Sequence, residues 1–114
     1  MLLSHADGQL VDDVLDGPLP RHTAKTVTDP HVLRQELAAC RRTGYAIVRG
    51  ELTEGADSIA TRIMDNEGHV VAALSVVVRS GSVRPQAVLP SVMTSGLGLS
   101  RRLGWRPGIP IRTA

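Results

Sequence analysis

Three acidic residues lie close together in the middle of the chain: Glu51, Glu54 and Asp57. Grouped carboxylates can act as a general acid and a general base when apolar surroundings raise the pKa of one of them. The local sequence offers little apolar cover and contains Gly50 and Gly55. It therefore predicts a solvated loop over residues 49–57 rather than an acid–base pair.

Other reactive side chains are scattered through the sequence. The four histidines are His5, His22, His31 and His69. No two of them share a helical face with a cysteine or carboxylate, so the spacing predicts no metal site. Cys40 falls on the apolar stripe of a predicted helix, where a thiol is usually a small core residue. No serine has a nucleophile-elbow context and no strand precedes a glycine-rich phosphate loop, so we expect no catalytic residue and no cofactor.

Two serines interrupt apolar segments that are otherwise typical of strands. Ser58 begins one such segment and Ser75 lies inside another. A hydroxyl on a strand either bonds to a neighbouring protein group or lines a cavity for a polar ligand. Both alternatives remain open from the residues alone.

The composition limits the class of protein. The 114 residues suffice for one domain, and with one Trp, one Tyr and no Phe the core must consist of aliphatic side chains. The net charge of +2 is too small to indicate nucleic-acid binding, and we expect the arginines near the C-terminus to be solvated. The single cysteine excludes an internal disulfide framework. No signal peptide or membrane-length apolar run is visible, which indicates a cytoplasmic protein.

Hydrophobic periodicity and turn residues predict an α+β fold in which an antiparallel β-hairpin is flanked by helices. The predicted helices cover residues 1–17, 29–44 and 85–103, and the predicted strands cover 45–48, 58–64 and 69–78. Residues 18–28 form an extended connector, 65–68 form the hairpin turn, and 104–114 form a frayed tail.

Local signals define the helix ends. Asp7 and Asp29 are candidate N-caps, and Pro30 suits the first helical position. Gly17 and Gly44 suit the left-handed conformation that often ends a helix. In the last helix, Pro90, Gly96 and Gly98 predict either a kink or a small-residue contact face.

Several short patterns occur in a characteristic order. Residues 19–29 follow Leu-Pro-x-x-Thr-x-x-Thr-Val-x-Asp, residues 41–46 follow Arg-x-x-Gly-Tyr-Ala, residues 51–55 follow Glu-x-x-x-Gly, and residues 70–75 follow Val-x-Ala-Ala-Leu-Ser. This order and spacing over residues 2–105 closely resembles the latter part of the C-terminal effector-binding domain of IclR-family transcriptional regulators. Thr61 and Arg62 stand where the family pattern has Ala and Pro.

The resemblance implies a partial GAF-like domain over residues 1–105, followed by a Gly/Pro/Arg-rich tail over 106–114. Members of the family pair a winged helix-turn-helix with an effector domain that binds small organic or aromatic acids and helps to form oligomers. We expect the DNA-reading part and the start of the effector domain to lie outside this sequence, so that DNA is contacted only through a domain that this chain lacks.

Position-by-position transfer implies an effector site formed by six residues: Val48, Gly55, Ala56, Ser58, Ser75 and Val77. Val48 and Val77 replace polar residues that suit very small acids, which favours a more apolar effector. The resemblance also implies that Glu51 anchors its loop and that Gly55 gives backbone clearance.

The sequence thus predicts a ligand-sensing and oligomerising part of a regulator, without catalytic activity and without a membrane partner. The alternative is a remnant that no longer regulates DNA, or a stand-alone small-molecule-binding module.

Overall fold

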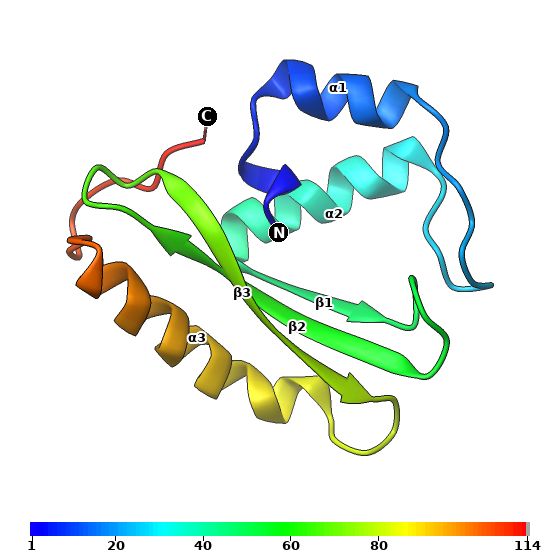
Figure 1. Ribbon diagram of the computed structural model, residues 1–114. Helices are drawn as coiled ribbons and strands as arrows, with labels where there is room; N and C mark the ends of the chain where they lie inside the picture. The colour runs from blue at the N-terminus through cyan, green and yellow to red at the C-terminus, as the bar shows by residue number, and fades with distance from the viewer. Residues whose placement is uncertain (114) are drawn as a thin grey trace.

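The computed structural model describes residues 1–113. Its centre is a three-stranded antiparallel sheet in the order β1 (Tyr45–Arg49), β2 (Ala56–Met64), β3 (Val70–Arg79). Figure 1 shows this sheet between α3 (Pro85–Arg102) and the pair formed by α1 (Gly8–Asp16) and α2 (Pro30–Thr43). A 3₁₀ turn, η1 (Leu3–His5), precedes α1. The predicted α+β architecture is confirmed.

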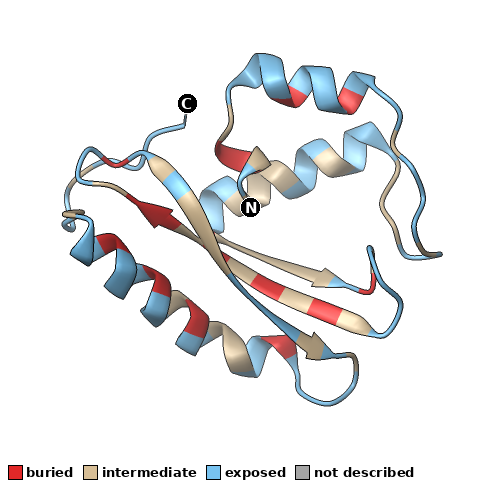
Figure 2. Cartoon of the chain, viewed as in Figure 1, coloured by how far each residue is buried: buried red, intermediate tan, exposed pale blue. Residues whose placement is uncertain are grey.

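The central strand β2 carries the core of the domain. Its alternate residues Asp57, Ile59, Thr61 and Ile63 are all buried, and Ile59 has no exposed surface. Successive strand residues point to opposite sides of a sheet, so these four share one side, hereafter the α3 face. The buried residues Val92, Gly96 and Ser100 form the matching stripe on α3, spaced at four-residue intervals. Figure 2 shows the alternation of buried and half-buried positions along β2.

Gly96 brings α3 close to β2. The Cβ of an alanine at this position would lie 2.4 Å from Cγ2 of Thr61, whereas a Cβ at Gly98 would meet nothing within 4 Å. The predicted small-residue contact is therefore confirmed for Gly96 and wrong for Gly98, which faces away from the sheet. The hydroxyl of Ser100 accepts a hydrogen bond of 3.0 Å from the amide of Met64 and holds the next turn of α3 in place.

The ends of α2 match the sequence signals. The Asp29 carboxylate accepts a hydrogen bond from the amide of His31 at 2.9 Å, and Pro30 occupies the first turn. Gly44 ends the helix with φ of +81°, a left-handed conformation that glycine adopts readily. The chain then reverses directly into β1, so α2 and β1 are neighbours.

The N-terminal prediction needs two corrections. The single helix predicted over residues 1–17 is divided into η1 and α1, because the Asp7 carboxylate accepts from the amide of Gln9 at 2.7 Å and starts a new helix. Gly17 is extended, with φ of −83°, so the left-handed end predicted there is wrong.

The hairpin is close to its predicted position, with each strand shifted by one or two residues. Asp65 forms the turn by accepting hydrogen bonds from the amides of Glu67 and His69 at 2.9 and 3.0 Å.

Residues 104–113, which follow α3, are held by hydrogen bonds and are not a frayed tail, contrary to the prediction. The amide of Arg112 donates to the carbonyl of Gly68 at 2.7 Å, and Trp105 Nε1 donates to the carbonyl of Ile109 at 3.2 Å. The domain boundary at residue 105 stays a prediction.

Candidate functional site

Five of the six predicted effector residues share the side of the sheet opposite the α3 face, four of them within the sheet and the fifth, Ala56, at the start of β2. Val48 pairs with Ser58, and Ser58 pairs with Val77, so these three form one cross-strand row. Ser75 pairs with Ala60 in the next row. Residues directly opposite one another in an antiparallel sheet project to the same side. We call this side the α2 face, because its far end contacts η1 and α2.

The α2 face is much less covered than the α3 face. Val48 and Ser58 are half-buried, Ser75 is exposed, and Val77 leaves 67% of its surface accessible. Neither the Ser58 nor the Ser75 hydroxyl has a hydrogen-bond partner within the described part of the chain. The structure therefore does not show the first alternative for these serines, a hydrogen bond to a neighbouring protein group. Both hydroxyls are free to bind a ligand.

The other two predicted residues lie where β2 begins. Ala56 projects to the α2 face, whereas Gly55 is exposed in the preceding loop with φ of +81°. A Cβ at Gly55 would meet no protein atom within 4 Å, so the left-handed backbone is the reason for glycine that the structure gives. A clearance role toward an effector stays a prediction.

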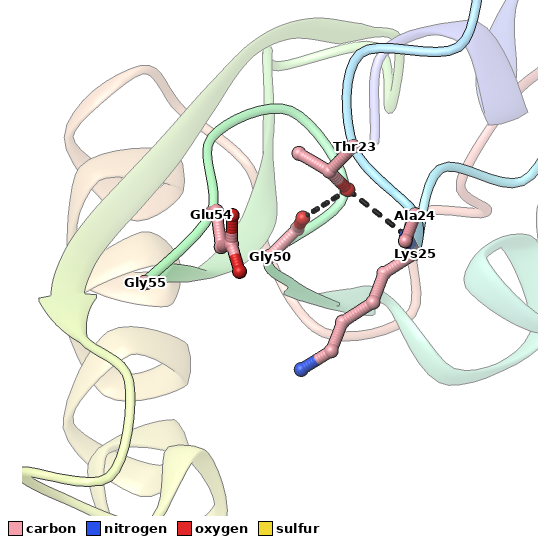
Figure 3. A pocket seen from close by; sticks show the side chains of 6 residues that line it. All are labelled: Thr23, Ala24, Lys25, Gly50, Glu54 and Gly55. Atoms are coloured by element: carbon pink, nitrogen blue, oxygen red, sulfur yellow. Dashed lines mark hydrogen bonds between the residues drawn. The ribbon is translucent and has the colours of Figure 1, made fainter.

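Gly55 lines a small cavity of about 90 Å³ together with five other residues: Thr23, Ala24, Lys25, Gly50 and Glu54. Figure 3 shows the Thr23 hydroxyl between the Gly50 carbonyl, to which it donates at 2.6 Å, and the amide of Lys25. The hydroxyl of Thr26 also donates to the carbonyl of Glu51. These bonds fix the connector to the acidic loop. The cavity is below the roughly 300 Å³ of ordinary ligand pockets.

A larger groove of about 440 Å³ lies between α2 and β1. Most of its lining is apolar and comes from these two elements: Leu33, Leu37, Ala39 and Cys40 of α2, and Tyr45, Ala46, Ile47 and Val48 of β1. Met1, Glu36, Thr43 and Glu51 complete the wall. This volume suits a small organic molecule. Val48 belongs both to the groove and to the α2 face, so the two surfaces meet there.

The acidic loop borders this groove and is not a uniformly solvated segment. Glu51 is half-buried, and burial, reinforced by the charge of Glu36, raises the pKa of its carboxyl. Asp57 is only 7% exposed and accepts a hydrogen bond of 2.7 Å from the Ser80 hydroxyl. The solvated-loop prediction is therefore wrong for Glu51 and Asp57, while Glu54 is exposed as predicted.

A polar cluster that the sequence did not indicate lies at the other end of the α2 face. Arg62 Nη1 donates to Nε2 of His5 at 3.1 Å and to the carbonyl of Arg41 at 3.0 Å. His5 Nδ1 lies 2.9 Å from the Ser4 hydroxyl. Since Arg62 has only donors, His5 must accept through Nε2 and carry its proton on Nδ1.

The pKa values of His5 and Arg62 are both lowered in this cluster. Burial lowers the pKa of His5, and the nearby positive charges of Arg62 and Arg41 lower it further. Burial also lowers the pKa of the Arg62 guanidinium. What the sequence does show is a charged residue, Arg62, within a predicted strand and at a position where the family pattern has proline.

Among residues 1–113, no three histidine, cysteine or acidic side chains gather as metal ligands would. The helices described are too short or too polar to cross a bilayer. Cys40 is half-buried in the groove wall, and burial raises the pKa of its thiol.

Comparison with known proteins identifies the family. The family described as "Bacterial transcriptional regulator IclR C-terminal" matches residues 1–95. The HTH-type transcriptional repressor AllR of Klebsiella pneumoniae is 31% identical over 102 residues, which cover 87% of this chain and 38% of the repressor. The chain belongs to the IclR family of bacterial transcriptional regulators. The resemblance seen in the sequence is confirmed, and the named relatives are regulators.

Two IclR-family crystal structures share the fold and contain aromatic acids. One is an IclR homologue from Microbacterium hydrocarbonoxydans in complex with 4-hydroxybenzoate, which is 36% identical in sequence with a TM-score of 0.83. The match covers 89% of this chain and 41% of the homologue's chain. The other is the inducer-binding domain of an Acinetobacter PobR double mutant in complex with 3-hydroxybenzoic acid, which is 27% identical with a TM-score of 0.78. The match covers 90% of this chain and 59% of that domain's chain. The chain thus spans about two fifths of the full-length relatives.

Proposed function

We propose that this chain is the effector-sensing part of an IclR-type transcriptional regulator and that it responds to a small aromatic carboxylic acid. The observation that carries the proposal is the groove of about 440 Å³, which joins the α2 face at Val48. Its walls are largely apolar, with polar groups from Glu36, Thr43, Tyr45 and Glu51, a lining suited to an aromatic ring with polar substituents. The hydroxybenzoates in two related structures support this ligand class.

The six predicted residues have different roles in this proposal. Val48 and Val77 contact the ring, and the Ser58 and Ser75 hydroxyls bind its polar substituents. Gly55 and Ala56 set the position of the loop beside Glu51. The aliphatic Val48 and Val77 disfavour very small acids such as glyoxylate, which bind through polar contacts alone.

A thermal-shift titration tests the ligand class. We expect 4-hydroxybenzoate or 3-hydroxybenzoate to raise the melting temperature, since a ligand at 100 times its dissociation constant stabilises a protein by about 2.7 kcal/mol. Glyoxylate should have no effect. Val77→Phe, on the α2 face, should weaken binding, whereas Val32→Phe, at an exposed position of α2, should not. If no aromatic acid shifts the melting temperature, the chain is better described as a remnant of a regulator.

We also propose that the protein acts in the cytoplasm as a homo-oligomer. The support for an oligomer is the free edge of β3, where residues 70–78 carry no charge and Val71 and Val77 are more than half exposed. Natural proteins usually protect such an edge with charges or with another strand. Light scattering after size-exclusion chromatography should give a dimer or larger species, which Val71→Lys disrupts and Val32→Lys does not. A monomer at every concentration would contradict this part.

DNA binding is expected to need a domain outside this chain. A gel shift with the DNA upstream of its own gene should therefore show no sequence-specific complex with the 114-residue chain. Tight, specific binding would overturn this view, while ligand binding without any effect on transcription would favour a stand-alone binding module.

A further inference from the structure

One end of the groove between α2 and β1 is acidic. Glu36 and Glu51 line it, and no lysine, arginine or histidine of the described chain belongs to the lining. The charge of Glu36 acts on the Glu51 carboxyl and raises its pKa, whereas the α-amino group of Met1 acts on the thiol of Cys40. The carboxylate of an aromatic acid would therefore be repelled from the end at Glu51.

The loop after β1 is held through the main chain of Glu51 and not through its side chain. The carbonyl of Glu51 accepts a hydrogen bond from the Thr26 hydroxyl of the connector. Its carboxyl forms no ion pair and no hydrogen bond within residues 1–113. Glu36, whose charge acts on this carboxyl, belongs to α2 on the opposite wall of the groove. The Glu51 carboxyl is therefore directed toward α2 and is not occupied by an anchoring contact.

The three acids of this loop have different surroundings. Asp57 is buried but accepts a hydrogen bond from the Ser80 hydroxyl at 2.7 Å, and Glu54 is exposed to water. Glu51 is half-buried and has neither a protein partner nor full hydration. Its oxygens are still accessible, because the described region contains no fully buried side-chain oxygen without a partner. A hydroxyl of a ligand would replace the hydration that this carboxyl loses on burial.

The groove is long enough for one substituted aromatic ring beside this acid. Its α2 wall includes Glu36 and Thr43, which are seven residues or about 10 Å apart along the helix. Its strand wall runs from Tyr45 to Val48, three steps that also span about 10 Å. Most of the lining between these ends is apolar and suits a ring face. A hydroxybenzoic acid fits this arrangement with its hydroxyl at Glu51 and its carboxylate away from both glutamates.

We propose that the Glu51 carboxylate accepts a hydrogen bond from a ring hydroxyl of the effector and so selects hydroxybenzoates over aromatic acids that lack a ring donor. The same contact sets the orientation of the ligand, with the hydroxyl at the acidic end of the groove. This proposal rests on the proposed function, because it concerns the same groove and the same ligand class.

Isothermal titration calorimetry tests the proposal with a matched pair of ligands. The compound 4-fluorobenzoate has the charge and nearly the size of 4-hydroxybenzoate but no ring hydrogen to donate. Wild-type protein should bind the hydroxy acid about ten- to a hundredfold more tightly, the usual range for a hydrogen bond to a charged group. Glu51→Gln should remove most of this preference. It should not weaken the binding of 4-fluorobenzoate, because it removes a charge of the same sign as the ligand.

The control is Glu54→Gln, which removes the exposed acid of the same loop and should change neither affinity. If Glu51→Gln does not fold, carbon-13 NMR of the wild type gives a second readout. The signal of the Glu51 carboxyl carbon should shift more at saturation with 4-hydroxybenzoate than at saturation with 4-fluorobenzoate. Equal shifts would contradict the proposal.

The results that would overturn this proposal are distinguishable from failure of the proposed function. If the wild type binds both acids equally well, or if Glu51→Gln keeps the preference for the hydroxy acid, Glu51 is not the hydroxyl partner and the proposed function stands. If the wild type binds no aromatic acid at all, the proposed function fails and this proposal fails with it.

Discussion

The two faces of the sheet differ in how completely they are covered, although the same strands form both. On the α3 face, Ile59 has no exposed surface and α3 approaches to contact at Gly96. On the α2 face, Ser75 and Val77 are exposed and the cover is limited to the end near Arg62. Because side chains alternate along a strand, one set of residues can maintain the fold while the other remains available for a ligand. Substitutions on the α3 face should therefore change stability, and those on the α2 face should change binding.

The largest expected effect is at the centre of the α3 face. Ile59→Ala should lower the free energy of unfolding by about 2–5 kcal/mol, because it leaves a cavity where no solvent enters. Urea denaturation followed by circular dichroism measures this. A loss below about 1 kcal/mol would mean that the α3 face is not the stability-determining side.

A smaller effect is expected at the contact between α3 and β2. Gly96→Ala should destabilise by about 1–3 kcal/mol, since its Cβ would lie 2.4 Å from Thr61 Cγ2. Gly98→Ala is the matched control, because a Cβ there meets nothing and replaces an exposed helical glycine. That variant should gain about 1 kcal/mol. Equal effects in the two variants would argue against the close approach at Gly96.

The pH dependence of stability probes the covered end of the α2 face. Burial lowers the pKa of folded His5 below its unfolded value of about 6.5, so the unfolded state binds more protons near that pH. Stability should therefore fall as the pH decreases from 7 through about 6.5 and below, until folded His5 is also protonated.

Thermal unfolding between pH 5.5 and 7.5 measures this slope. His5→Gln should reduce it, and His31→Gln, at an exposed position of α2, should leave it unchanged. If His5→Gln leaves the slope as in the wild type, His5 is not the group responsible.

The smallest effect on stability is expected at the open part of the α2 face. Ser75→Ala should change the free energy of unfolding by no more than about 0.5 kcal/mol, because its hydroxyl is exposed. The same variant should weaken the binding of a hydroxybenzoate measured by calorimetry. A stability loss as large as that of Ile59→Ala would remove the distinction between the two faces.

Sequence reasoning succeeded where the signal is local. Asp29, Pro30 and Gly44 define both ends of α2, and the apolar segments around the turn at Asp65 define the hairpin. It failed at Gly17, where a glycine after a helix is equally compatible with an extended backbone. It also missed the ordered residues after α3, since their partner is a backbone carbonyl at Gly68, which no side-chain pattern reports.

The candidate site was only partly accessible from sequence. Side chains alternate between the two faces along β2 and β3, and this alternation places Ser58, Ser75 and Val77 on one face once the register is known. The groove depends on how α2 lies along β1, and the contact of Arg62 with His5 joins residues 57 positions apart. Neither of these two arrangements is encoded in a local sequence pattern, so both emerge only from the folded chain.

Gly68 determines what happens at one end of the open β3 edge. Its φ is +86°, and a Cβ there would lie 1.9 Å from the carbonyl oxygen of Pro110, so only glycine lets the chain after α3 lie against the turn. Arg112 then forms a parallel bridge with His69, the residue before β3. The bridge at His69 thus leaves less of this edge available for the addition of another strand.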